Sequence, residues 1–548
     1  MIAHRNTDLV VLGGGLAGVA AALAVARLGG TAVIVSETEW LGGQVSSQGI
    51  PPDEHPWIET TGCAPGYRAF RDAVRDFYRR HYPLTAAARS QARLNPGLGN
   101  IGPISHEPSV AALVIEELVA PWRALGRITV LRGFRVTGAV TARDRVDSVT
   151  VTDGDREHEL RGTSYLDATD LGDLLEAAAV EHVIGAESRD QTGEPHALDA
   201  PDPLDQQAIT WALALAYEPG ADHVIDRPDG YARWRDYRPD FWPGPLLGWT
   251  VSDYVTHEPR ERPLFLADPP ENGVRYDLWH ARRVLAADQL ESDSGLPPSD
   301  ITIAAWPMMD YFALPLVGAD EATTARALDE AREFTLSFLH WMQTEAPRHD
   351  GGQGYPELVP RGDVLGTHDG LAQLPYVREG RRIVPEFRVC EQHIGVEARP
   401  GRDGAERFHD SVGIGAYRMD LHPSTSGRNT LDLDTWPFEI PLGALLPARV
   451  DNVLAAGKTM GTTHLTNGAY RVHPVEWTAG EAAGALAAYC AQRKAVPRQV
   501  RSNEHHLAEL QRLLTGTLGA ELRWPDYGPL TPTRRFGYVP TGARGANG

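Results

Sequence analysis

Two histidines in the last quarter of the chain, His422 and His473, have the side-chain chemistry of proton transfer near neutral pH. An imidazole can accept the proton of a hydroxyl or amine while a hydride leaves the neighbouring carbon atom. Loss of a proton and a hydride oxidises the molecule that carries them. We therefore expect His422 or His473 to be the base in an oxidation of this kind. For each histidine alone, a hydrogen-bonded structural role is the alternative.

A second group with functional chemistry is charged. Arg378, Glu379, Arg381 and Arg382 lie together in the stretch REGRR. Guanidinium groups bind carboxylates and hydroxyl-rich molecules through paired hydrogen bonds, so we include Arg381 among the candidate catalytic residues. An ion-paired segment that serves the fold explains the same residues equally well.

Aromatic residues of the middle region could line a substrate pocket. They are Trp306, Tyr311, Phe312, Tyr355 and Tyr376. Large aromatic side chains more often pack in a core, and this is the preferred interpretation.

These groups need elements that position them, and the N-terminal segment predicts the first. The stretch DLVVLGGGLAGVAAALAVARLGGTAVIVSE has the pattern of strand, glycine turn, helix and strand. In GxGxxG the first glycine permits a tight turn, the second lets a pyrophosphate approach, and the third lets helix and strand pack closely. The unpaired N–H groups of the helix start then face the phosphates. The predicted contacts are Gly13, Gly15, Leu16, Ala17 and Gly18.

Residues after the second strand extend this nucleotide site. Glu37 is placed to accept hydrogen bonds from an adenosine ribose. The glycine spacing alone is common to NAD and FAD proteins. The next residues, WLGGQVSSQG, place Gly42, Gly43 and Gln44 where FAD enzymes of the glutathione reductase type make a second flavin contact, and they resemble that motif. A plain turn is the alternative for these glycines.

Further motifs in the same order resemble the FAD-dependent oxidoreductase family from about residue 7 to residue 492. They are YLDATDLGDLL with Ala168, Thr169 and Asp173, then REGRRIVPEF, HDSVGIGAYRMDLHP, and AGKTMGTTHLTNGAYRVHPVEWTAGEAAG from Ala456. The resemblance implies a two-dinucleotide-like fold with a single dinucleotide, FAD, bound between the N- and C-terminal parts.

The segment from Ala456 is expected to close this FAD site. Gly457 ends a strand, and a helix begins near Pro474 or Val475. Small residues recur along that helix at helical spacing, so another backbone can approach it, and we expect the helix to lie beside Gly13 to Gly18. A packing helix without a ligand is the alternative. The remaining predicted FAD contacts are Val136, Gly457, His464, Ala469 and Arg471.

The composition restricts the partners. The chain has 548 residues, 42% of them hydrophobic, and a formal net charge of −21. Such a protein repels phosphate backbones and anionic membranes, so we expect a small-molecule substrate and neither nucleic acid nor a membrane. Its three cysteines are far apart and form no CxxC, which favours the cytoplasm. No HxxxH or HExxH motif occurs, and no metal site is expected. The oligomeric state stays open.

We predict an α/β protein with a Rossmann-like FAD-binding domain formed by both ends of the chain and an inserted α+β substrate domain. The predicted parts are 1–200 and 405–492 for the FAD domain, 205–400 for the substrate-facing domain, and 493–548 for a C-terminal helix and tail.

The expected reaction is that of a dehydrogenase or oxidase. A small or medium-sized organic substrate transfers a hydride to N5 of FAD, and the electrons pass to oxygen or another acceptor. No second GxGxxG follows a strand and precedes a helix, so a dedicated NAD(P)H domain is not expected. Two alternatives remain: a monooxygenase that uses NAD(P)H, and a flavin-binding module in which FAD is structural.

Overall fold

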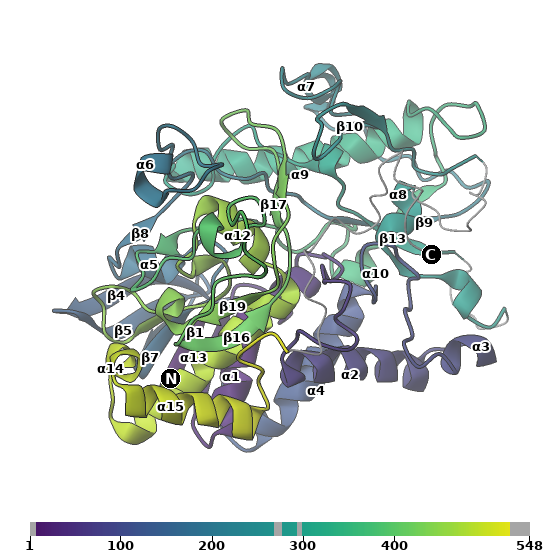
Figure 1. The fold of residues 1–548 in the computed structure, drawn as a ribbon. Helices are drawn as coiled ribbons and strands as arrows, with labels where there is room; N and C mark the ends of the chain where they lie inside the picture. The colour runs from purple at the N-terminus through teal and green to yellow at the C-terminus, as the bar shows by residue number, and fades with distance from the viewer. Residues whose placement is uncertain (1–6, 268–276, 293–298, 526–548) are drawn as a thin grey trace.

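The computed structural model describes residues 7–267, 277–292 and 299–525 (Figure 1). The predicted tail beyond residue 525 lies outside these residues. Within them, no helix is both long enough and apolar enough to cross a membrane.

The centre of the molecule is a five-stranded parallel sheet with the order β20-β7-β1-β2-β3. Its strands are β1 (Thr7–Leu12), β2 (Ala32–Ser36), β3 (Ile128–Arg132), β7 (Gly162–Asp167) and β20 (Val453–Ala455). Val11 of β1 pairs with Ile34 on one side and Leu166 on the other. The strand β20 comes from the far end of the chain and pairs with β7. Both ends of the chain therefore build one sheet, which confirms the predicted α/β fold.

Two long helices pack together on this sheet, α1 (Leu16–Arg27) and α13 (His473–Arg493). A Cβ atom on Gly480 would lie 2.0 Å from the carbonyl oxygen of Ala17, and one on Gly484 would lie 2.2 Å from that of Ala21. The expected close approach of another backbone to α13 is thus observed, and its partner is the helix of the GxGxxG motif.

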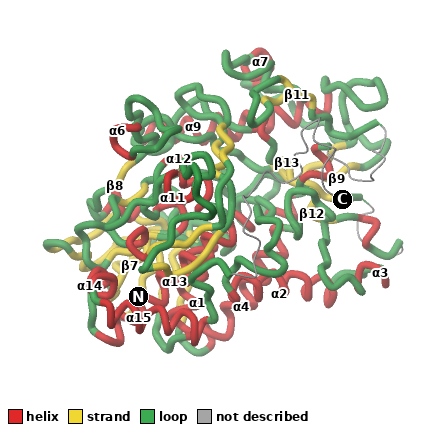
Figure 2. Tube along the Cα trace, viewed as in Figure 1, coloured by secondary structure: helices red, strands yellow, loops and turns green. Residues whose placement is uncertain are grey.

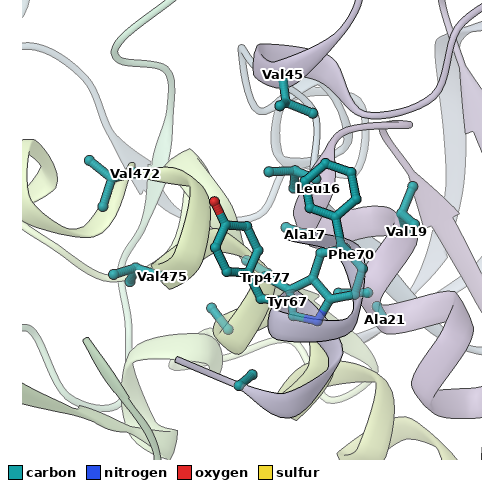
Figure 3. Close-up of a cluster of buried hydrophobic side chains, with 14 of the residues drawn as sticks. Leu16, Ala17, Val19, Ala21, Val45, Tyr67, Phe70, Val472, Val475 and Trp477 are labelled. Carbon is teal, nitrogen blue, oxygen red and sulfur yellow. The ribbon is translucent and has the colours of Figure 1, made fainter. Parts of the chain in front are cut away.

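Aromatic side chains of α2 (Pro65–His81) also pack against α13. Figure 3 shows Trp477 of α13 beside Phe70 and Tyr67 of α2, next to Leu16 of α1. The rings of Phe70 and Trp477 are stacked with centroids 6.1 Å apart. These contacts place α1, α2 and α13 in one hydrophobic core, together with α4 (Pro108–Ala124).

A small antiparallel sheet lies between β3 and β7 in the chain. It consists of β4 (Arg135–Ala142), β5 (Arg145–Thr152) and β6 (Glu157–Leu160). Its first residues follow β3 directly, so they lie at the same end of the parallel sheet as the glycine turn.

The middle of the chain forms a second layer around an antiparallel sheet with the order β12-β13-β9-β14. Its elements are β9 (Leu213–Tyr217), β12 (Arg283–Leu285), β13 (Ile301–Ala304), β14 (Leu358–Pro360) and the long helix α9 (Glu321–Thr344). Figure 2 shows how much of this region is loop. A separate core, rich in tryptophan, holds it together. That core includes Trp306, Tyr311, Phe312 and Tyr355, so these aromatic residues pack as the preferred interpretation expected.

Short elements complete the fold. The helices are α3 (Ala86–Arg89), α5 (Asp173–Ala177), α6 (Arg189–Thr192), α7 (Tyr231–Asp236), α8 (Leu278–Ala281), α10 (Gly362–Leu365), α11 (Glu391–Ile394), α12 (His464–Tyr470), α14 (Pro497–Ser502) and α15 (Glu504–Leu513). The strands are β8 (His182–Val183), β10 (Thr250–Ser252), β11 (Pro259–Glu261), β15 (Arg382–Ile383), β16 (Ser411–Gly415), β17 (Met419–Leu421), β18 (Leu431–Leu433) and β19 (Phe438–Pro441).

Candidate functional site

The turn between β1 and α1 has the geometry of a phosphate cradle. Gly13 has φ +110°, and a Cβ atom there would lie 2.1 Å from the carbonyl oxygen of Ala168. A Cβ on Gly18 would lie 2.0 Å from the carbonyl oxygen of Gly13. By contrast, a Cβ on Gly15 would meet no atom within 4 Å, so the backbone there faces open space. Gly13 and Gly18 therefore have the turn and packing roles that the motif predicts, and the contact of Gly15 with a ligand stays a prediction.

Two adjoining cavities extend from this turn. Both are lined by Gly15, Gly43 and the loop 168–170, so they form one continuous site. The larger cavity is also lined by Gly13, Ser36, Glu37, Phe134, Arg135, Val136, Asp173, Ser47, Gln48, Leu374, Pro375 and Val377. The smaller one adds Ala17, Gln44, Gly457, Lys458 and Glu476. A long ligand can thus run from the β2 end to the start of α13.

The β2 end of the site suits an adenosine. Glu37, an exposed residue, lines the larger cavity together with Arg135 and Val136. Desolvation of the carboxylate raises the pKa of Glu37 to about 7, the carboxylates of Asp173 and Asp170 act in the same direction, and Arg135 opposes them. An acceptor at this position can take hydrogen bonds from ribose hydroxyls.

The α13 end is buried and charged. Lys458 is 2% exposed and forms an ion pair with Asp170, which also accepts a hydrogen bond from Gln48 at 2.5 Å. Glu476 lies in the first turn of α13, and burial raises its pKa to about 7 against the opposing effect of Lys458. Because Lys458 and Asp170 form an ion pair, the protein itself balances the positive charge at this end of the site.

The predicted FAD contacts divide into two groups. Those that line the cavities are Gly13, Gly15, Ala17, Glu37, Gly43, Gln44, Val136, Ala168, Thr169, Asp173 and Gly457. Those that do not line them are Leu16, Gly18, Gly42, His464, Ala469 and Arg471. Leu16 is in the core of α1, and Gly18 supports the turn. The Nδ1 atom of His464 lies 2.9 Å from Glu379 and its Nε2 atom 2.8 Å from Arg428, so both ring nitrogens have protein partners.

His422 is held by a buried aspartate. Its Nδ1 atom lies 2.5 Å from Oδ2 of Asp310, which is fully buried. Asp310 also accepts hydrogen bonds from Thr210 at 2.6 Å and from Arg378 at 3.1 Å. Burial opposes ionisation of Asp310, but the charge of Arg378 and the hydrogen bonds from His422 and Thr210 outweigh it and lower the pKa. An ionised Asp310 fixes the proton of His422 on Nδ1 and leaves Nε2 as a base.

His473 has a different environment. It is fully buried, and burial lowers its pKa to about 3, so the ring is neutral. Its Nδ1 atom accepts a hydrogen bond from the backbone N–H of Asp53 at 3.1 Å. The lone pair of the neutral ring is therefore already used, and Nε2 carries the proton. Of the two predicted bases, the geometry favours His422.

Arg381 has structural partners in the loop that follows β7 and in α5. It donates to Glu176 at 2.7 Å and to the carbonyl of Leu171 at 3.0 Å. It lines neither cavity, and its catalytic role stays a prediction without a contact to support it.

Sequence reasoning did not select Asp310, Lys458, Asp170 and Glu476. Lys458 and Glu476 lie inside a segment whose glycines and histidines were selected, so their positions beside Gly457 and Pro474 were a usable signal. Asp310 is 112 positions from His422 and has no local motif. In the described part of the chain, no group of three His, Cys, Asp or Glu side chains is arranged to hold a metal ion.

Comparison with known proteins places this chain in a family. No curated protein matches the sequence. Among solved structures, p-nitrophenol 4-monooxygenase PnpA from Pseudomonas putida DLL-E4 is 11% identical, with a TM-score of 0.35 over 94% of this chain and 86% of that one. The quinol fumarate reductase FrdA of E. coli, in a mutant form, is 11% identical, with a TM-score of 0.33 over 94% of this chain and 74% of that one. The model of the family described as FAD dependent oxidoreductase matches residues 8–514. The chain therefore belongs to the FAD dependent oxidoreductase family and is an FAD-binding enzyme.

Proposed function

We propose that this enzyme oxidises a small or medium-sized organic substrate and that His422 accepts the substrate proton. The observation that carries the proposal is the contact between His422 and the buried carboxylate of Asp310. FAD, when bound, supplies a hydride acceptor at N5. The electrons then pass to oxygen or another acceptor.

The chain's own residues support binding of FAD in the continuous cavity. The turn at Gly13 to Gly15 and the start of α1 offer backbone N–H groups to the diphosphate. Glu37 is the acceptor for the ribose, and Lys458 lies near the opposite end with Glu476. The start of α13 favours negative charge at that end, because a helix N-terminus carries partial positive charge.

Asp310 and His422 form the proton-accepting pair. Asp310 holds the Nδ1 proton, so the Nε2 lone pair is free to take a proton from a hydroxyl or amine. The side chain of His422 is 14% exposed, whereas that of Asp310 is not exposed at all. The histidine is therefore the member of the pair that a substrate can reach.

The test starts with the visible spectrum of the purified protein, followed by anaerobic reduction with pools of alcohols, amines and hydroxy acids. We expect His422→Asn to keep FAD and to slow flavin reduction by about 10²- to 10⁴-fold, the usual contribution of a general base. His505→Asn is the matched control, because that side chain is 75% exposed. Reduction of His422→Asn at the wild-type rate would overturn the proposal. NAD(P)H consumption coupled to oxygen insertion would replace it with a monooxygenase.

A further inference from the structure

We propose that the second layer has a binding site of its own, which takes an organic cation such as an alkylated ammonium. The site is a cavity of about 1050 Å³ beside the antiparallel sheet β12-β13-β9-β14. The described residues that line it are all different from those that line the two FAD cavities. The inference therefore does not depend on the proposed role of His422.

The cavity has the size of a small-molecule site and a fixed framework. Such sites usually measure about 300 to 1000 Å³. An ion pair between Arg283 of β12 and Asp300 crosses its lining, with Nη1 and Oδ2 2.7 Å apart. The Nε atom of Arg283 donates to the carbonyl of Gly97 at 2.7 Å, and the backbone N–H of Ala287 donates to Asp300 at 2.8 Å. These bonds hold the walls in place before a ligand binds.

Three aromatic rings in mutual contact line the cavity, those of Tyr217, Phe265 and Trp279. The ring centroid of Phe265 lies 5.3 Å from that of Tyr217 and 5.1 Å from that of Trp279. The Tyr217 ring is inclined by 68° to Phe265 and by 76° to Trp279, so the rings form a corner. Tyr217 and Phe265 are only partly buried, whereas Trp279 is 2% exposed and supports them. Aromatic ring faces attract cations, because they carry partial negative charge.

The charges of the lining also favour a cation. Arg283 is the only lysine or arginine among the described lining residues, and Asp300 balances it. Glu218 and Asp288 add two exposed carboxylates, and Glu218 also contacts His223 at 2.7 Å. Three further basic side chains near the cavity are each paired with a carboxylate: His280 with Asp277 at 2.6 Å, Arg348 with Glu357 at 2.9 Å and Arg361 with Asp363 at 2.6 Å. The cavity therefore has an excess of negative charge.

Rings and carboxylates together select the class of ligand. Quaternary ammonium groups are recognised by aromatic ring faces, because their charge is spread over apolar methyl groups. The methyl groups suit the corner formed by Tyr217 and Phe265, and the charge suits Glu218 and Asp288. The formal net charge of −21 also raises the concentration of cations near the protein.

The experiment titrates the FAD-loaded protein with acetylcholine and with its carbon analogue, in which a neutral tert-butyl group replaces the trimethylammonium group. Isothermal titration calorimetry measures both affinities. We expect saturable binding of acetylcholine and about five- to thirtyfold weaker binding of the analogue, because a cation gains that much from aromatic rings. If the analogue binds as tightly, or if acetylcholine does not bind, the inference is wrong.

Two variants locate the cation. Phe265→Leu keeps an apolar side chain but removes a ring, so the acetylcholine Kd should rise about threefold or more. Asp288→Asn removes one exposed charge and should raise the Kd about two- to fivefold. FAD content should stay at the wild-type level, because neither residue lines the FAD cavities.

Phe77→Leu and Asp199→Asn are the matched controls, since Phe77 belongs to α2 and the Asp199 side chain is 94% exposed. Asp288 is also exposed, so its replacement tests the site even where Phe265→Leu lowers stability. If acetylcholine binds Asp288→Asn and a folded Phe265→Leu with the wild-type Kd, it binds elsewhere and the inference is wrong.

Discussion

The FAD cavity and the proposed proton-accepting pair are built in different ways. The turn of the FAD cavity comes from one short segment, in which Gly13, Gly15 and Gly18 lie within six residues of chain. Asp310 and His422 come from two distant segments, and neither residue lines the two cavities of the FAD site. A local motif therefore builds the turn, whereas the pair depends on tertiary packing.

The largest expected effect distinguishes the proton-accepting pair from the FAD cavity. Asp310→Asn removes the charge that orients His422, so flavin reduction should slow by about 10²- to 10⁴-fold. FAD content should not change, because Asp310 lines neither cavity. Anaerobic stopped-flow reduction and the absorbance ratio of flavin to protein measure the two quantities.

The control for this variant is its pH profile. A positioning role predicts that Asp310→Asn changes the pH dependence of reduction, since the tautomer and charge of His422 change with it. If Asp310→Asn loses FAD in proportion to its loss of reduction rate, the FAD cavity and the proton-accepting pair are not separable.

The second prediction concerns the burial of Glu476. Its pKa rises from 4.5 to about 7 in the folded protein, so the fold favours the protonated form. Ionisation therefore removes stability as the pH increases from about 4.5 to about 7. Above pH 7, Glu476→Gln should stabilise the FAD-free protein by up to about 3 kcal/mol, and near pH 4.5 the difference should vanish. Urea unfolding at pH 5 and pH 8 measures it.

Glu117→Gln is the matched control for Glu476, because the Glu117 side chain is 47% exposed and pairs with Arg80 on the surface. Its difference from the wild type should be independent of pH. If the difference in unfolding free energy between Glu476→Gln and the wild type is the same at pH 5 and pH 8, the raised pKa of Glu476 is contradicted.

The third prediction tests the contact between α1 and α13. Gly480→Ala places a Cβ atom against the carbonyl of Ala17, so the helices must separate. We expect a loss of about 1 to 3 kcal/mol in the free energy of unfolding, with weaker FAD binding, because both ends of the cavity rest on this helix pair. Gly516→Ala is the control, since its Cβ would meet no atom within 4 Å. Equal stability of the two variants would show that the helix contact tolerates a methyl group.

The difference between a local motif and contacts of distant segments explains how much of the fold and the site the sequence could predict. The turn at Gly13, the predicted ribose acceptor Glu37 and the small residues of α13 follow rules of local spacing; the turn and the helix contact are observed, and Glu37 lines the larger cavity. The partner of His422 could not be found in this way. Asp310 reaches it only because a loop of the inserted layer folds onto the strand-rich region before β20, and such contacts depend on tertiary packing and not on spacing. Arg471 shows the same limit: it was predicted to contact FAD, but its side chain donates to Tyr376 and to the carbonyl of Asp420 and lines neither cavity.

The smallest expected effect lies at the phosphate end and concerns Glu37. Ribose hydroxyls donate hydrogen bonds to an ionised carboxylate, so the predicted contact of Glu37 with FAD favours loss of the proton that Glu37 holds with a pKa of about 7. The Kd of FAD should therefore rise about tenfold between pH 8 and pH 6, by linkage of binding to one proton. Glu37→Gln should bind FAD more weakly at pH 8 and lose most of this pH dependence. Fluorescence titration of the FAD-free protein at pH 6, 7 and 8 measures both effects. If the pH dependence survives in Glu37→Gln, the titrating group is one of its neighbours, Asp170 or Asp173, whose charges raise the pKa of Glu37.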